Sequence, residues 1–160
     1  MHKIENAELW IVGDGPKKKE FQGLTKNLGL DDKVKFIGKI LPEKLREITQ
    51  KADLGVSIEE NNGLSYYFSM PNKISDYIQA RIPVVVSDFP EMRKVADHFK
   101  AGEKIRDYNE LAQKIQLVLN NGKHSYKDAL DYAASQLCWE NEENRLLGLF
   151  SKIKSRTPKS

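Results

Sequence analysis

Short apolar runs, each followed by a segment with helical spacing, repeat from Leu9 to Gly122 and restrict the fold more than any other feature. These runs favour β-branched and aromatic residues and lack the polar alternation of a half-exposed strand. They are Leu9–Val12, Val34–Ile37, Leu54–Ile58 and Val84–Val86, with Lys104–Ile105 as a short fifth. Apolar strands separated by helices indicate a parallel sheet buried on both faces. We therefore predict an α/β fold with a doubly wound, Rossmann-like parallel sheet.

Signals at the ends of the intervening helices support this alternation. Pro16 is expected as the first residue of a helix that carries Phe21, Leu24 and Leu28 on one face and stops at Gly29. Pro42 opens a second helix that runs to about Lys51. Further helices are expected at Phe89–Phe99, around Leu111–Leu119, at Tyr126–Leu137 and at Glu140–Lys154, with a frayed exit at Thr157 and Pro158.

Length and composition point to one domain that handles small molecules. A chain of 160 residues fits a single domain, 1–160, with a C-terminal helix and tail at 139–160. The net charge of +3 is too small to indicate nucleic-acid binding. The single cysteine, Cys138, and the lack of a long apolar stretch favour a cytoplasmic protein. His2, His98 and His124 are far apart without acids or cysteine at metal spacing, so we expect no metal site and no cofactor.

The stretch from Ser69 to Asp88 is the strongest candidate for a ligand site. Pro71, Asn72 and Lys73 open a helix whose first amides are unpaired, and Lys73 adds a positive charge, which suits a diphosphate. Alternatively, Ser69 caps the helix and Lys73 is solvated. The preceding loop, Glu59–Met70, is unusually long for a compact domain, which favours a functional role.

Residues around this helix extend the candidate site. Asp76 can accept hydrogen bonds from both hydroxyls of a ribose, or it can be a first-turn acid favoured by the helix dipole. The acids Glu59 and Glu60 are candidates to bond sugar hydroxyls. The aromatic run from Tyr66 through Tyr67 to Phe68 can stack on a base or sugar, or fold the loop back onto the domain.

Two further candidate site residues, both glycines, lie at the first strand-to-helix turn. Gly13 and Gly15 can let a phosphate approach the helix, or they can serve only the tight turn. Lys18 stands where a dinucleotide-binding fingerprint has its third glycine, so NAD binding is not favoured.

Together these segments resemble the nucleotide-sugar-binding C-terminal half of retaining GT-B glycosyltransferases of the group 1, or family 4, type. The similarity covers about Leu9 to Phe150. Its segments are LWIVGDGP, VKFIGKI, ADLGVSI and SDYIQARIPVVVSD, together with the Cys138-Trp139-Glu140 entry to the last helix.

The resemblance implies roles for individual residues. Asp76 matches the second acid of the family's E-x7-E motif, which binds the donor ribose, whereas Phe68 stands in place of the first acid, near the transferred sugar. Asn72 and Lys73 would face the diphosphate, with Lys73 stabilising the leaving group. The full set of residues expected at the donor is Gly13, Gly15, Gly38, Lys39, Ile40, Glu59, Glu60, Ser69, Met70, Pro71, Asn72, Lys73 and Asp76, of which Gly38 to Ile40 would lie near the base.

The resemblance also implies parts that this sequence does not contain. The family's C-terminal half begins with one more strand and helix, which carry an Arg and a Lys for the diphosphate, and an N-terminal half binds the acceptor. We therefore expect a fragment that binds a UDP- or GDP-sugar weakly and does not transfer it alone.

The implied function is transfer of a sugar from a nucleotide-sugar to a saccharide or lipid-linked acceptor in surface polysaccharide assembly. The full-length protein would be cytoplasmic, with peripheral association at the inner face of the cell membrane left open. Two alternatives share the fold: a non-catalytic module that uses the aromatic loop for a protein partner, and a sugar-nucleotide epimerase, for which the expected extra acids and histidine are not evident.

Overall fold

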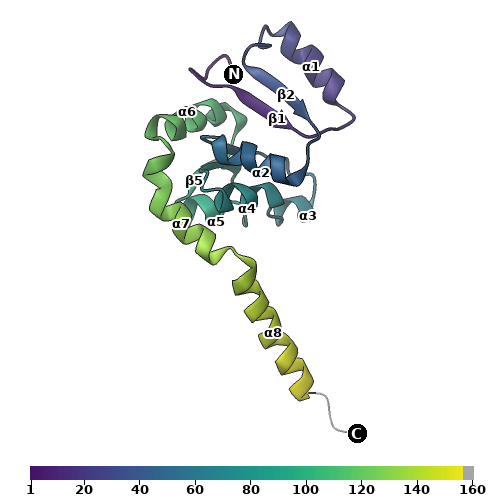
Figure 1. Cartoon of the computed structure of the whole chain (residues 1–160), viewed down its shortest axis with the longest axis vertical. Coiled ribbons are helices and arrows are strands. Elements are labelled where there is room, and N and C mark those ends of the chain that lie inside the picture. Colours follow the sequence, from purple (N-terminus) through teal and green to yellow (C-terminus); the bar gives the residue numbers. More distant parts are fainter. Residues whose placement is uncertain (157–160) are drawn as a thin grey trace.

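The computed structural model describes residues 1–156, with side chains to Ile153, as an α/β structure with parallel strands (Figure 1). The strands are β1 (Leu9–Val12), β2 (Val34–Gly38), β3 (Gly55–Ser57), β4 (Val84–Ser87) and β5 (Gly102–Ile105). The helices are α1 (Lys18–Asn27), α2 (Pro42–Lys51), α3 (Leu64–Tyr67), α4 (Asn72–Gln79), α5 (Arg93–Asp97), α6 (Leu111–Asn121), α7 (Lys127–Gln136) and α8 (Trp139–Arg156). Two 3-10 turns, η1 (Tyr108–Glu110) and η2 (Lys123–Tyr126), flank α6. The predicted alternation of strands and helices is confirmed, whereas the predicted exit at Thr157 and Pro158 lies outside the described residues.

The five strands form two parallel sheets rather than one continuous sheet. β1 pairs with β2, and a second sheet has the order β3-β4-β5. Leu9 lies opposite Val34 in the first sheet, and Val84 lies opposite Gly102 in the second. Among the described strands, no pairing joins β1 to β3. The single sheet that the sequence predicts is therefore divided into two.

The core lies around β4, which is buried on both faces as the sequence predicts. The side chains of Val84, Val85 and Val86 are inaccessible to solvent. Ile78 of α4 and Leu130 of α7 pack into the same cluster and are also inaccessible. The helical face predicted before Arg81 is thus confirmed as the face that packs on the sheet.

The first strand is not buried, which contradicts the prediction from its apolar sequence. Leu9, Trp10 and Ile11 keep between 37% and 48% of their surface exposed. The apolar face of α1 is also open, since Phe21 is 47% exposed and Thr25 is the only buried residue of that helix. A strand with one neighbouring strand, near a helix whose own apolar residues are open to solvent, leaves its side chains accessible to water.

Three boundaries differ from the sequence-based expectations. α1 begins at Lys18 because Pro16 lies in the preceding turn, although Gly29 ends the helix with a φ of +62° as expected. Phe89–Phe99 is helical only in α5, since the amide of Phe89 bonds the carbonyl of Ser87 in a turn. The long Glu59–Met70 loop contains the single helical turn α3.

The last helix, α8, projects away from the rest of the molecule (Figure 1). Leu146, Leu147 and Phe150 on this helix are exposed. Among residues 1–156, no helix combines the length and apolarity needed to cross a bilayer.

Gly55 of β3 occupies a position where a larger residue would not fit. A Cβ atom at Gly55 would overlap the ring of Tyr77, which packs against the core from α4. We expect Gly55→Ala to lower the free energy of unfolding by about 1–3 kcal/mol, the usual cost of overpacking. Urea unfolding followed by circular dichroism measures this change. An unchanged unfolding midpoint would show that Tyr77 moves aside without cost.

Gly23→Ala is the matched control. A Cβ at Gly23 would meet no atom within 4 Å, and this glycine lies inside α1. Alanine is favoured over glycine in a helix interior by about 0.5–1 kcal/mol, so this variant should be slightly more stable than the parent chain.

Candidate functional site

The carboxyl ends of β3, β4 and β5 surround an open cavity of about 370 Å³. Its lining comes from three strand exits: 58–61 after β3, 87–89 around the end of β4, and 105–108 around the end of β5. Ligands of doubly wound sheets bind beyond the carboxyl ends of the strands. The cavity therefore lies at the edge of the sheet where the sequence predicts a ligand, and it includes Glu59 and Glu60.

Glu59 is held in place by the end of the neighbouring strand. Its backbone amide donates a hydrogen bond to the hydroxyl of Ser87 at 2.8 Å, and that hydroxyl donates to the backbone carbonyl of Glu59 at 3.0 Å. Ser87 is only 5% exposed, so this pair of bonds is shielded from water. The start of the long loop is consequently fixed to β4, with the Glu59 carboxylate at its edge.

The carboxylate of Glu59 forms an ion pair with Lys73, which brings two predicted site residues together. Glu59 Oε1 lies 2.9 Å from Lys73 Nζ, and the lysine side chain is 44% exposed. Lys73 is the second residue of α4; the amide of Ile74 already donates to the carbonyl of Pro71 at 2.9 Å, whereas the amides of Asn72 and Lys73 have no carbonyl one turn earlier to bond. The amides and the ammonium group together give this helix end a positive potential that an anion can share.

The residues before α4 show how this helix begins. Pro71 is the N-cap and makes no side-chain bond, so Asn72 starts the helix as its first residue. The Ser69 hydroxyl donates instead to the carbonyl of Tyr66 at 3.0 Å, which rules out the alternative that Ser69 caps α4. Met70 is partly buried and packs against the core, which fixes the turn before α4 to the domain.

Asp76 lies one turn along α4 and is exposed. It is not a first-turn acid, because α4 begins at Asn72 and its first turn has no acidic residue. Burial raises the pKa of the Tyr77 hydroxyl, and the negative charge of Asp76 adds to that rise. The carboxylate of Asp76 therefore lies beyond the first turn of α4, which carries Lys73.

The glycine turns after β1 and β2 form a second group of predicted residues. The amide of Gly13 donates to the carbonyl of Gly38 at 2.9 Å, which joins the two turns. Gly38 has a φ of +81°, and a Cβ there would lie 3.5 Å from Nζ of Lys18. Gly15, Lys39 and Ile40 follow directly in these turns. Lys18, which the sequence offered only as a departure from a dinucleotide fingerprint, therefore places a cation beside Gly38, and its Nζ also lies 3.7 Å from Oδ1 of Asp14.

The two groups of predicted residues remain separate in this structure. One consists of Glu59, Glu60 and the start of α4, and the other of the glycine turns after β1 and β2. Within residues 1–156, no hydrogen bond or ion pair connects them, and their strands belong to two different sheets. The residues expected around one donor are thus divided between two sites.

Asp88 is a functional candidate that the sequence did not reveal. It follows β4, lines the cavity, and is only 14% exposed. Its carboxylate lies 3.1 Å from Nε of Arg93, 3.1 Å from Nε of Arg106 and 3.6 Å from Nζ of Lys104. These cations come from α5, from β5 and from the segment after it, so only tertiary proximity brings the cluster together.

The aromatic loop is partly folded back onto the domain. The ring of Tyr67 packs against Phe89 with centroids 5.3 Å apart, and against Phe68 at 5.0 Å. Tyr66 and Phe68 remain 53% and 57% exposed. Tyr67 therefore folds back onto the domain, as one of the two alternatives predicted, while Tyr66 and Phe68 present accessible rings.

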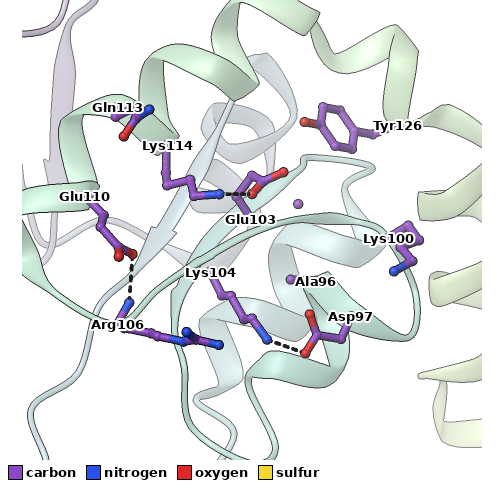
Figure 2. A pocket seen from close by; sticks show the side chains of 11 residues that line it. Ala96, Asp97, Lys100, Glu103, Lys104, Arg106, Glu110, Gln113, Lys114 and Tyr126 are labelled. Atoms are coloured by element: carbon purple, nitrogen blue, oxygen red, sulfur yellow. Dashed lines mark hydrogen bonds and ion pairs between the residues drawn. The ribbon is translucent and has the colours of Figure 1, made fainter.

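Figure 2 shows a different cavity, of about 690 Å³, between β5, α5 and α6. Four of its charged side chains form two ion pairs: Lys104 with Asp97, and Lys114 with Glu103 at 2.7 Å. The hydrogen bond from Lys104 lowers the pKa of Asp97. None of the predicted site residues lines this cavity, and we keep it apart from the candidate site.

The chain belongs to the family described as glycosyl transferases group 1, whose sequence profile matches residues 1–121. Its parallel α/β structure resembles GT-B glycosyltransferase domains.

Solved structures and one curated relative give the extent of the similarity. Sucrose-phosphate synthase from Thermosynechococcus elongatus superposes with a TM-score of 0.75 at 20% identity, over 94% of this chain and 39% of that chain. HepE from Anabaena, solved in complex with UDP, gives 0.72 at 17% identity, over 92% of this chain and 42% of that one. The lipopolysaccharide core biosynthesis glycosyltransferase LpsD of Rhizobium meliloti (strain 1021) is 50% identical over 36 residues, which are 22% of this chain and 10% of LpsD. The chain thus spans less than half of each of these proteins.

Proposed function

We propose that this chain is the donor-binding domain of a retaining glycosyltransferase that takes a UDP- or GDP-sugar. The observation that carries the proposal is the position of Lys73, at the open amino-terminal end of α4 and 2.9 Å from Glu59 at the carboxyl-end rim. Membership of a glycosyltransferase family and a structural neighbour solved with UDP support the same ligand class.

The chemistry assigned to this helix end is stabilisation of the leaving group. When the bond between the sugar and the diphosphate breaks, negative charge develops on the diphosphate oxygens. The first amides of α4 and the ammonium group of Lys73 are preorganised donors for that charge, which is the main protein contribution in reactions of this kind. These groups belong to the chain itself, and the step that we propose requires no metal ion.

The remaining predicted residues have roles along the donor. Asp76, exposed on α4, would accept hydrogen bonds from the ribose hydroxyls, and Gly38 to Ile40 would lie beside the base. Glu59 and Glu60, which line the cavity, would bond the sugar hydroxyls. Because Glu59 already pairs with Lys73, an incoming diphosphate must share or replace that ion pair.

The whole protein would pass the sugar to a saccharide or lipid-linked acceptor in surface polysaccharide biosynthesis, on the cytoplasmic side of the cell membrane. The relative LpsD, a lipopolysaccharide core biosynthesis glycosyltransferase, supports this assignment. Acceptor binding would come from polypeptide outside these residues, and no nucleic-acid partner is proposed.

Titration calorimetry with UDP and GDP on the parent chain and on Lys73→Ala tests the proposal. A charge-assisted hydrogen bond to phosphate contributes about 1.5–3 kcal/mol, so Lys73→Ala should weaken binding by about tenfold or more. The matched control is Lys44→Ala on α2, because Lys44 also pairs with a glutamate, Glu47, at 2.6 Å but lies away from the cavity. Equal binding heats for the parent chain and Lys73→Ala would contradict the assignment of Lys73 to the diphosphate.

A second candidate is a non-catalytic module that binds a protein partner through the aromatic loop. The exposure of Leu64, Tyr66 and Phe68, at 77%, 53% and 57%, favours it. Melting temperatures that rise with added UDP or GDP support the donor-binding domain, since a ligand that binds only the folded state stabilises it. Self-association without any nucleotide-dependent shift supports the module instead.

A further inference from the structure

The cavity of about 690 Å³ in Figure 2 lies between α5, β5 and α6, apart from the predicted site residues. Its lining includes Ala96 and Gly102, which have a methyl group and a hydrogen atom as side chains and so leave the space between longer side chains open. The other lining side chains are polar or charged, and in Figure 2 they surround this space. The volume is in the range of small-molecule sites, and the polar lining indicates a hydrophilic ligand.

Cations outnumber acids in the lining of this cavity. The cations are Lys100, Lys104, Arg106 and Lys114, and the acids are Asp97, Glu103 and Glu110. Each acid already accepts a bond, since two of them pair with lysines and Glu110 accepts from the backbone amide of Arg106 at 3.1 Å. An anion that enters the cavity therefore meets a surplus of positive charge.

Lys100 supplies this surplus. Within residues 1–156, its ammonium group forms no hydrogen bond and no ion pair. The hydrogen bond from Lys104 lowers the pKa of Asp97, and the charge of Lys104 and then that of Lys100 add to this effect. The two lysines act on the same carboxylate, so both can act on one anion at this side of the cavity.

The backbone of Lys100 supports a role for its side chain. Lys100 has a φ of +57°, in the left-handed region, within the turn that joins α5 to β5. The next residue, Ala101, fixes this turn by donating to the carbonyl of Val95 at 2.9 Å. Glycine would adopt this conformation with less strain, because it has no Cβ atom. A lysine in its place puts an ammonium group at the cavity, and strain of this kind points to function.

We propose that this cavity binds a small phosphate monoester that carries hydroxyl groups, with its phosphate at Lys100 and Lys104. An ammonium group is a compact point charge that suits phosphate oxygens. Lys104 can turn from Asp97 to the phosphate, because the side chain of Asp97 is 50% exposed and water can solvate it. Lys100 needs to give up no partner.

Three further polar side chains suit the hydroxyl groups of such a ligand. The hydroxyl of Tyr126 accepts from Nδ2 of Asn121 at 3.2 Å, so its own hydrogen remains available to donate. The amide of Gln113 offers donors and an acceptor, and the carboxylate of Glu103 can accept more than its bond from Lys114. Inorganic phosphate cannot reach these groups through a carbon skeleton, so a sugar phosphate should bind more tightly.

Occupancy of this cavity also changes the surroundings of Asp88 at the candidate site. Nζ of Lys104 lies 3.6 Å from Asp88 Oδ1, and Nε of Arg106 lies 3.1 Å from Asp88 Oδ2. Arg106 lines both cavities. A phosphate that draws Lys104 away removes part of the positive charge around Asp88. Binding in the cavity of Figure 2 is thereby transmitted to the end of β4.

Nuclear magnetic resonance titrations of the 160-residue chain with glucose 6-phosphate and with inorganic phosphate, at constant ionic strength, test this site. The backbone amide signals of residues 100–104 and of Gln113 should shift and saturate, with smaller shifts at residues 87–89. Glucose 6-phosphate should bind more tightly than inorganic phosphate. Lys100→Gln should weaken the binding of both by about tenfold or more, because a charge-assisted hydrogen bond to phosphate is lost.

Two further variants separate binding from charge and from folding. Lys94→Gln on α5 is the matched control, because it removes the same charge from a lysine that pairs with Glu91 at 2.6 Å and lines neither cavity. Its affinity for glucose 6-phosphate should equal that of the parent chain. Lys100→Gly should melt no lower than the parent chain, since glycine suits a positive φ, yet it should lose affinity as Lys100→Gln does.

Any of three results would overturn this assignment. The first is equal affinity of the parent chain and Lys100→Gln for glucose 6-phosphate. The second is equal affinity of the parent chain for the two probes, which would remove the role of the hydroxyl groups. The third is a set of shifts confined to Asn72 and Lys73, which would place the anion at the start of α4. The phosphate site is independent of the proposed donor site, which calorimetry with UDP and GDP tests separately.

Discussion

Replacing Leu130 with alanine is expected to lower the free energy of unfolding by about 2–5 kcal/mol, the range for deleting a buried leucine side chain. Leu130 lies on α7, is inaccessible to solvent, and belongs to the cluster around β4. The same cluster contains Ile74 and Ile78 of α4, so the cavity left by the substitution opens beneath the helix that presents Lys73. Urea unfolding measured by circular dichroism and tryptophan fluorescence gives the change.

Leu147→Ala is the matched control for this prediction. Both leucines lie in helices, but Leu147 on α8 is 60% exposed. Exposed substitutions of this kind usually change the stability by less than about 0.5 kcal/mol. Similar losses in the two variants would mean that α8 packs on the core, contrary to its projecting position in Figure 1.

Asp88→Asn is expected to destabilise the chain by about 1.5–3 kcal/mol, the range for hydrogen bonds that involve a charged group. The substitution keeps the shape of the side chain but removes the negative charge among Arg93, Arg106 and Lys104. These three cations would then repel one another at the cavity edge. Thermal unfolding at low and high salt measures the effect, and added salt should recover part of the loss because it screens the repulsion.

Asp131→Asn provides the same chemical change at an exposed site. Asp131 bonds Lys127 at 2.7 Å and Arg81 at 2.6 Å, and these hydrogen bonds lower the pKa of its carboxyl. Its side chain is 45% exposed, so water can replace its partners. The melting temperature should therefore change much less than in Asp88→Asn. A larger change in melting temperature for Asp131→Asn than for Asp88→Asn would show that burial does not determine the cost of removing the charge.

The sequence was sufficient to predict most elements because their signals are local. The apolar run at Val84–Val86 predicted the central strand, and Pro42 and Lys51 marked the ends of α2 as observed. The burial of Ile74 and Ile78 followed from their spacing on one helix face. These features depend on residues a few positions apart.

Features that depend on tertiary neighbours could not be predicted in the same way. The run at Leu9–Val12 has the composition of a buried strand, yet in the described residues β1 pairs with β2 alone, and Leu9, Trp10 and Ile11 stay more than a third exposed. The cluster around Asp88 brings together residues from three segments, and no sequence spacing links them. The Glu59–Lys73 pair was foreseen as two separate ligand residues, but their contact was not.

The two hydrogen bonds between Ser87 and Glu59 have a consequence for the thermodynamics of ligand binding. They order the first residue of the long loop before any ligand arrives. Ordering a loop on binding reduces the affinity through lost conformational entropy, and a segment that is already fixed avoids that cost. In Ser87→Ala, the Glu59 end of the loop would have to be ordered by the ligand itself, so binding would show a less favourable entropy even where every direct ligand contact is retained.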